Sequence, residues 1–301
     1  MPEIGHKFSL RHERWLNFFS SMLEKTASDL NKWQLLTQRV NERAAALTTA
    51  HLAEVGIEAV LFKGWSVARF YPTSTIRTYG DIDIAVDPAD YPRAVERIRT
   101  GPTEKLGIDL HEGFRDRDTL PWSNIYSRTY TVDLDGKPVR VLGEEDQLRM
   151  VASHWLIDGG LFQDKLWDIY YLVENRKPDF DWSLSVGAAG PIRRTWVISA
   201  IATARDYLDL DLAGVPEEIV NFKLPNWYVQ ALKREWSKGP YLRLPILSCL
   251  KRPKVLFEQV SRRFPPNPIA ATTDAEGPID ESPRLRYQVK SILKKVRSAA
   301  L

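Results

Sequence analysis

Residues 79–86 read Tyr-Gly-Asp-Ile-Asp-Ile-Ala-Val, and this stretch decides the fold. Ile82 and Ile84 alternate with Asp81 and Asp83, which is the period-two pattern of a half-buried β-strand. Side chains two positions apart on a strand point the same way and lie about 6.6 Å apart along the backbone. The stretch therefore predicts a strand that presents both carboxylates on one face and buries the isoleucines on the other.

Two carboxylates on one strand face need a compensating cation. Carboxylates this close repel one another and lose hydration unless positive charge lies between them. In phosphoryl chemistry the usual partner is a pair of Mg²⁺ ions about 3.5–4 Å apart. Asp81 and Asp83 are therefore candidate catalytic ligands for Mg²⁺ or Mn²⁺. The simpler alternative is an edge strand with two solvated acids, and the strand alone does not decide between the two.

The segment before this strand favours a nucleotide site. The apolar residues 57–62 predict a buried strand that runs into Lys-Gly-Trp-Ser and then a short helix. A strand end, a glycine, a hydroxyl and a helix start aim backbone N–H groups at a phosphate. A lysine adds a point charge for the phosphates and an arginine adds a two-pronged donor. The expected nucleotide contacts here are Lys63, Gly64, Ser66 and Arg77.

These residues carry a family resemblance. The segment LFKGWSVARFYPTSTIRTYGDIDIAV (61–86) resembles the "LKG…YP…R…DIDLLV" core of the uncharacterised nucleotidyltransferases, a branch of the DNA polymerase β-like superfamily. The likeness continues in GEEDQLRMVASHWLIDGGLFQDKLWDIYYLVE (143–174), which is similar to that family's "PEDxLLxLxxH…K…D" helices. In this chain Trp65 separates the usual glycine-serine pair.

The resemblance implies a reaction. It implies Mg²⁺-dependent transfer of a nucleoside monophosphate from an NTP, with ATP the expected donor, to a hydroxyl or phosphate acceptor, with release of pyrophosphate. The superfamily also uses a third carboxylate from a neighbouring strand.

Two acids compete for the place of the third carboxylate. In the strand-like stretch 106–114, Asp109 is the preferred candidate, as a metal ligand and as the general base for the acceptor hydroxyl. Asp133, in the strand-like stretch 130–134, is the alternative. His111 is a candidate acceptor contact, and a purely structural histidine is the competing interpretation.

Lys165 and Asp168 lie three residues apart in a predicted helix. One interpretation is an ordinary surface ion pair, worth only tenths of a kcal/mol. The other places Lys165 across a cleft on the NTP phosphates, held there by Asp168. Both interpretations remain open at this point.

The chain is expected to have an α+β fold with three parts. Residues 1–55 predict N-terminal helices packed on the core, 56–142 a polymerase β-like nucleotidyltransferase core with a small mixed sheet, and 143–301 a helical C-terminal lobe. The Pro-rich stretch 265–283 predicts an irregular loop. Two other functions stay open, namely an NTP-binding regulatory module without catalysis and a nucleic-acid-binding protein that uses the helical lobe.

Charge is unevenly distributed. Segment 222–265 holds ten Lys/Arg against two Glu, a net of +8, whereas the whole 301-residue chain is only +3. A basic lobe suits an anionic acceptor such as RNA or a phosphorylated peptide, and a solvated basic face is the alternative. The absence of an 18-residue apolar run predicts a cytoplasmic protein without a membrane partner. The single Cys249 excludes an internal disulfide. The sequence leaves the oligomeric state open.

Overall fold

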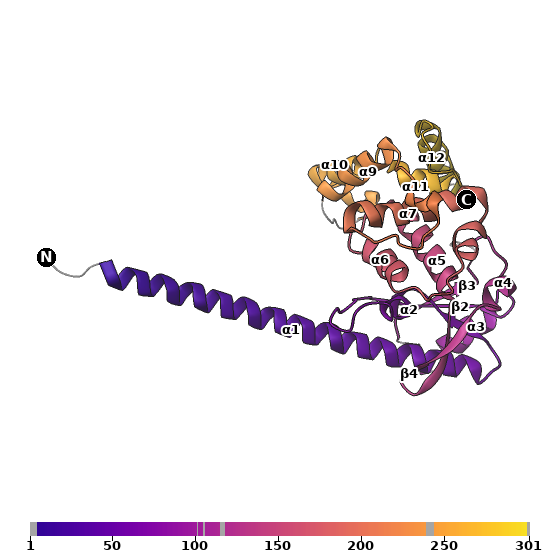
Figure 1. Ribbon diagram of the computed structural model, residues 1–301, viewed down its shortest axis with the longest axis horizontal. Coiled ribbons are helices and arrows are strands. Elements are labelled where there is room, and N and C mark those ends of the chain that lie inside the picture. The colour runs from indigo at the N-terminus through magenta and orange to yellow at the C-terminus, as the bar shows by residue number, and fades with distance from the viewer. Residues whose placement is uncertain (1–4, 101, 105, 115–117, 239–243, 300–301) are drawn as a thin grey trace.

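A computed structural model of the chain describes residues 5–100, 102–104, 106–114, 118–238 and 244–299. A five-stranded mixed sheet lies at one end of the molecule and a helical lobe at the other (Figure 1). The strands are β1 (Ala59–Leu61), β2 (Ile82–Val86), β3 (Ile108–Glu112), β4 (Tyr130–Leu134) and β5 (Lys137–Val141). The structure confirms the α+β class predicted from the sequence.

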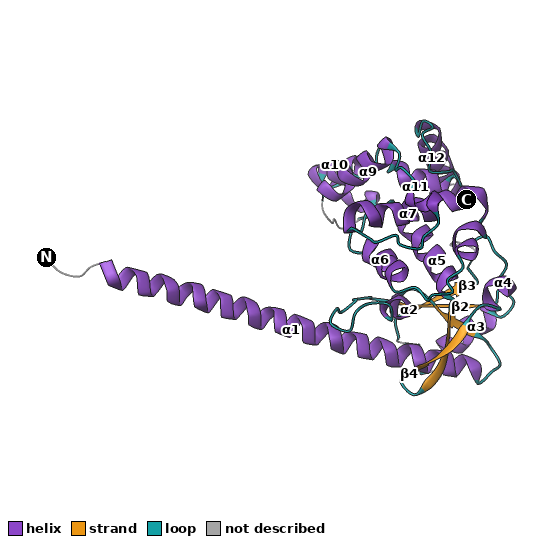
Figure 2. Cartoon of the chain, in the orientation of Figure 1, coloured by secondary structure: helices purple, strands orange, loops and turns teal. Residues whose placement is uncertain are grey.

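The helices account for most of the chain (Figure 2). Those around the sheet are α1 (Gly5–Ala53), α2 (Gly64–Ala68), α3 (Tyr91–Arg99) and α4 (Trp122–Tyr126). Those of the lobe are α5 (Glu144–Ile157), α6 (Leu166–Glu174), η1 (Ser183–Gly187), α7 (Gly190–Leu208), α8 (Glu217–Val220), α9 (Asn226–Ser237), η2 (Ile246–Cys249), α10 (Pro253–Ser261), α11 (Pro268–Asp274) and α12 (Leu285–Ala299). Among the described helices, none is long and apolar enough to cross a membrane.

The strand order is β3-β2-β1-β5-β4. Strand β2 runs parallel to β3 and antiparallel to β1, and β1 runs parallel to β5. Strands β4 and β5 form an antiparallel hairpin whose turn, Asp135-Gly136, has φ of 54° and 72°. A turn with positive φ at both central residues matches the twist of the flanking strands.

Strand β2 is covered on both faces. Ile82 and Ile84 pack into an apolar cluster with Leu52 of α1, as their alternation predicts. On the opposite face, Ala85 packs with Met150 of α5. All five residues of β2 are therefore buried, although the alternating pattern predicted a half-buried strand. The second cover comes from α5, which lies far from β2 in the sequence.

Residues 5–53 form one helix, α1, where the sequence predicted several. Residues 6–55 contain neither glycine nor proline, so the chain meets no helix breaker before Gly56, whose φ is 73°. Near its C-terminal end, Ala45, Ala46 and Leu52 are buried against the sheet. Figure 1 shows the N-terminal part of α1 projecting away from the rest of the molecule.

The lobe has its own apolar core. Trp155 of α5 and Trp196 of α7 are fully buried in it, together with Tyr228 of α9. The predicted irregular loop 265–283 is wrong in part, because residues 268–274 form helix α11. The Asn267 side chain caps this helix by accepting hydrogen bonds from the Ile269 and Ala270 amides, at 2.8 and 3.0 Å.

Candidate active site

Parallel pairing of β2 and β3 brings two of the predicted acids face to face. Asp83 is the register partner of Asp109, and Ala85 is the partner of His111. Because side chains two apart on a strand share a face, His111 projects to the same side as Asp109. Leu110 projects to the other side, into the apolar cluster on the α1 face.

The three polar side chains form one cluster. Nε2 of His111 lies 3.0 Å from Oδ1 of Asp83 and 3.2 Å from Oδ2 of Asp109. One ligand atom from each of the three residues lies within 4.8 Å of the other two. Asp83 is buried, whereas the Asp109 side chain is 54% exposed. Asp81 lies two residues before Asp83 and lines the same cleft.

Asp133, the alternative third acid, lies elsewhere. It is on β4, at the opposite edge of the sheet from β3, with β1 and β5 between β4 and β2. Its carboxylate accepts a hydrogen bond from the Gly136 amide at 3.4 Å, within the hairpin turn. The structure therefore places Asp109, and not Asp133, beside Asp83.

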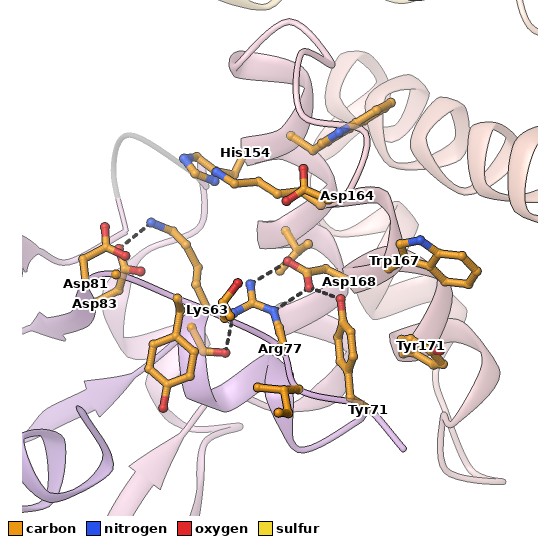
Figure 3. Close-up of a pocket in the computed structure, with 18 of the residues that line it drawn as sticks. Lys63, Tyr71, Arg77, Asp81, Asp83, His154, Asp164, Trp167, Asp168 and Tyr171 are labelled. Carbon is orange, nitrogen blue, oxygen red and sulfur yellow. Dashed lines mark hydrogen bonds and ion pairs between the residues drawn. The ribbon is translucent and has the colours of Figure 1, made fainter. Parts of the chain in front are cut away.

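Lys63 supplies positive charge to the cluster. Its Nζ lies 2.6 Å from Oδ1 of Asp83, and both side chains are almost fully buried (Figure 3). Its backbone has φ of 52°, an unusual value for a residue with a side chain, and this turn leads into α2. Burial alone would raise the pKa of Asp83, but the hydrogen bond from His111 and the charge of Lys63 outweigh it and hold the pKa below its ordinary value.

Arg77 is bound to the protein itself. Its Nε and Nη2 donate to the two carboxylate oxygens of Asp168 at 2.5 and 2.6 Å, and its Nη1 donates to the Gly64 carbonyl at 2.9 Å. The Tyr71 hydroxyl donates to the same carboxylate at 2.7 Å (Figure 3). Burial would lower the pKa of Arg77, yet the bonds to Asp168 raise it above its ordinary value.

This arrangement differs from the predicted one. Asp168 pairs with Arg77 and Tyr71, and the ion pair of Lys165 in this structure is with Asp158. The donors of Arg77 bind the Asp168 carboxylate and the Gly64 carbonyl. A planar guanidinium matches a carboxylate better than an ammonium does, which explains why Asp168 pairs with Arg77.

Ser66 is also placed differently from the prediction. Its side chain is buried, and its Oγ donates to Oε1 of Gln147 on α5 at 3.0 Å. It does not line the cleft, whereas Lys63 and Gly64 do. Ser66 therefore joins α2 to the helical lobe.

A cleft of about 780 Å³ lies between the sheet and the helical lobe. The predicted site residues that line it are Lys63, Gly64, Arg77, Asp81, Asp83, Asp109, Lys165 and Asp168. Lys165 lies on the lobe side, 40% exposed, with Nζ 3.7 Å from Oδ2 of Asp158 and 4.6 Å from the centre of the Phe162 ring. Among the described residues of the basic segment 222–265, none lines this cleft.

Sequence reasoning missed the aromatic wall of the cleft. The Tyr71 and Tyr171 rings lie 4.4 Å apart, and Trp167 stacks on Tyr171 at 5.6 Å. Figure 3 shows Trp167 and Tyr171 at the end of the cleft away from Asp81 and Asp83. The aromatic run Trp-Asp-Ile-Tyr-Tyr at 167–171 was the available signal. His154 also lines the cleft.

A family of known proteins is similar to part of this chain. Residues 20–101 match a family described as uncharacterised nucleotidyltransferase, which confirms the resemblance seen in the sequence. This segment is therefore similar to the nucleotidyltransferase domains of that family. It includes Lys63, Asp81 and Asp83 and ends before Asp109.

The crystal structure of an antigenic nucleotidyltransferase-like protein from Paracoccidioides brasiliensis aligns at 12% identity and a TM-score of 0.38, covering 56% of this chain and 89% of that chain. None of the curated proteins matches the sequence.

The residues fit a divalent metal ion. Magnesium prefers carboxylate oxygens, which Asp83 and Asp109 provide, and manganese also accepts an imidazole such as that of His111. The ammonium of Lys63 beside Asp83 shows that the buried carboxylate already binds one cationic group.

Proposed function

We propose that the protein is a metal-dependent nucleotidyltransferase that moves a nucleoside monophosphate from an NTP, with ATP the expected donor, to a hydroxyl or phosphate acceptor. One observation carries the proposal. Asp83 and Asp109 are register partners on adjacent parallel strands beside a large cleft, with a lysine on each side of it. Two isolated acids on the surface would not lie beside a large cleft with a lysine on each side.

The acidic side of the cleft would hold Mg²⁺ or Mn²⁺. Asp81, Asp83 and Asp109 are the proposed ligands, and His111 fixes the orientation of the last two through its Nε2. When bound, the metal would neutralise charge on the reacting phosphates and on the leaving pyrophosphate. Nε2 of His111 is hydrogen-bonded to Asp83 and lies 3.2 Å from Asp109, which favours this role over contact with the acceptor.

The transfer step uses the chain's own groups. Asp109, which is more exposed than Asp83, takes the proton from an acceptor hydroxyl. The acceptor oxygen then forms a bond to the α-phosphorus, while the bond from that phosphorus to the bridging oxygen breaks and pyrophosphate leaves with the electron pair. A phosphate acceptor, already ionised, would need no proton transfer.

The two lysines would bind the triphosphate from opposite sides. Lys63 neutralises Asp83 in this structure, and a metal ion bound there would release its ammonium toward the phosphates. Lys165 is the more exposed of the two and lies on the helical side. Arg77 and Asp168 act as positioning residues, because Arg77 holds the carbonyl of Gly64, the residue next to Lys63.

The experiment is a transfer assay. The purified protein is incubated with each NTP labelled on the α-phosphate and with Mg²⁺ or Mn²⁺, alone and with cell extract, and labelled species are identified by mass spectrometry. Labelling that is lost in Asp83→Asn and kept in Asp133→Asn supports the proposal. Labelling that persists in Asp83→Asn refutes it.

The close Lys63–Asp83 pair favours a second candidate, an NTP-binding regulatory module without catalysis. In such a module Lys63 would keep neutralising Asp83 and no metal would be needed. NTP binding measured by calorimetry in the presence of a chelator, with no pyrophosphate released under any condition, would support this candidate over the enzyme.

A further inference from the structure

The C-terminal helix α12 leaves an apolar stripe uncovered. Leu285, Val289, Leu293 and Val296 are spaced for one helix face, and they are 70%, 47%, 54% and 61% exposed. The opposite face packs on the lobe, where Tyr287 and Ser291 are buried. The stripe is therefore not needed to attach α12 to the rest of the protein.

Basic residues run directly beside this stripe. Each apolar residue is followed in the sequence by a lysine or arginine, at Arg286, Lys290, Lys294 and Arg297. One residue along a helix is a rotation of about 100°, so these four form a second stripe next to the first. Lys294 is paired with Asp274 at 2.8 Å and Lys290 donates to the Ala275 carbonyl at 3.1 Å, so the second stripe keeps an excess of positive charge with one of its four cations neutralised. No acidic residue occurs between Leu285 and Ala299.

A second exposed apolar group lies on α10. Gln288 of α12 donates to the Pro266 carbonyl at 2.7 Å, which brings the chain just after α10 against α12. Phe257, Val260 and Phe264 are spaced for one face of α10 and its extension, and all three are exposed. Figure 1 shows α10 and α12 on the side of the lobe away from the sheet.

We propose that the apolar stripe of α12, with the basic residues beside it, binds an anionic lipid bilayer. A helix with an exposed apolar stripe flanked by Lys and Arg binds in the plane of a membrane interface through apolar burial and attraction to anionic headgroups. RNA would satisfy the charges and leave the leucines and valines in water. The sequence argued against a membrane partner because it lacks a spanning segment, and a helix on the membrane surface requires none.

The test is flotation of the full chain with vesicles. Phosphatidylcholine vesicles that contain phosphatidylserine should bind the protein, and pure phosphatidylcholine vesicles should bind it much less. Val289→Asp with Leu293→Asp should lower the bound fraction by about tenfold or more, because both apolar contacts are lost. The matched control is Ile192→Asp with Val220→Asp, which changes two exposed apolar residues, each 38% exposed, on α7 and α8.

Three results would overturn the proposal. The first is that anionic vesicles do not bind the wild-type protein, and the second is that the Val289→Asp/Leu293→Asp variant binds them as well as wild type. The third is that the wild-type chain is a dimer in analytical ultracentrifugation and that this variant is a monomer. The last would assign the stripe to a second copy of the chain. Thermal melts of all variants check folding, and the assay does not depend on nucleotidyl transfer.

Discussion

Arg77 and Asp168 form a two-pronged ion pair that joins the segment before β2 to helix α6, 91 residues away in the sequence. Both side chains are largely buried, at 13% and 6% exposure. Because Arg77 also holds the Gly64 carbonyl, this pair connects the helical lobe to the turn that carries Lys63.

Breaking this pair should destabilise the protein. Asp168→Asn leaves the guanidinium without its charged partner, and we expect a loss of about 3 kcal/mol in the free energy of unfolding. Arg93→Lys, which alters the more exposed surface pair with Asp90, is the control and should change stability by less than about 0.5 kcal/mol. Urea unfolding measures the stability of both variants. Equal losses of stability in the two variants would contradict a stabilising role for the Arg77–Asp168 pair.

Replacing both Arg77 and Asp168 by apolar residues tests separately whether the pair stabilises the fold and whether it positions the Lys63 turn. Arg77→Met combined with Asp168→Leu should recover much of the lost stability, since it removes both charges together. It should not recover transfer activity, because the Gly64 carbonyl loses its donor. Full activity in this double variant would show that Arg77 does not position the Lys63 turn.

Each acid of the proposed metal site should be required for transfer. Asp81→Asn, Asp83→Asn and Asp109→Asn should each lower kcat at least tenfold, or about 1.4 kcal/mol in the activation barrier. Asp133→Asn should leave kcat unchanged, because this residue lies at the far edge of the sheet. A steady-state assay with saturating NTP checks the series. If Asp109→Asn kept wild-type activity, Asp109 would not be the general base.

Lys165→Ala should weaken use of the NTP and leave the fold intact. Its side chain is 40% exposed on the wall of the cleft, so we expect a raised KM and an unchanged melting temperature. Lys177→Ala is a matched control, since that lysine has the same exposure and does not line the cleft. An unchanged KM in Lys165→Ala would show that Lys165 does not contact the NTP.

The attachment of α12 should depend on pH. Asp274 accepts hydrogen bonds from Ser291 and Lys294 of α12, at 2.7 and 2.8 Å. Burial would raise the pKa of Asp274, but these bonds outweigh it and hold the pKa below the ordinary 3.8. A depressed pKa stabilises the fold above the ordinary value, and this stabilisation is lost as the pH falls through the lower folded value.

The corresponding variant is Asp274→Asn. It should cost about 1 kcal/mol at neutral pH. The difference from wild type should shrink as the pH falls below 3.8. Urea unfolding of both proteins across that range measures it. A difference that stays constant with pH would mean that the carboxylate charge contributes nothing.

Features that depend on local periodicity could be predicted from the sequence. The alternation at Asp81–Val86 indicated strand β2, and the pattern at 106–114 placed Asp109 on the face opposite the apolar cluster. The same patterns could not decide between Asp109 and Asp133, because that choice depends on which strands are neighbours. Pairing of β2 with β3, and not with β4, settles where each acid lies.

Other features depend on contacts that no short segment reveals. The Arg77–Asp168 pair joins residues 91 positions apart, so Asp168 was assigned to Lys165, its neighbour on the predicted helix. Helix α11 was missed because Pro and Gly flank it, although Asn267 caps it and Ile269 is buried in the lobe. The Pro and Gly content of residues 265–283 predicted a loop, although the Asn267 cap favours a helix.

The parallel pairing of β2 with β3 constrains the order of residues within β3. Strand side chains alternate with a period of two, so inserting or deleting one residue between Ile108 and Leu110 would turn Asp109 or its apolar neighbours to the wrong face of the sheet. The connection from α3 to β3 is not part of this pairing, and a change in its length is absorbed outside the strands. Relatives that keep the third acid should therefore keep the alternation around it and vary freely in the length of the connection before it.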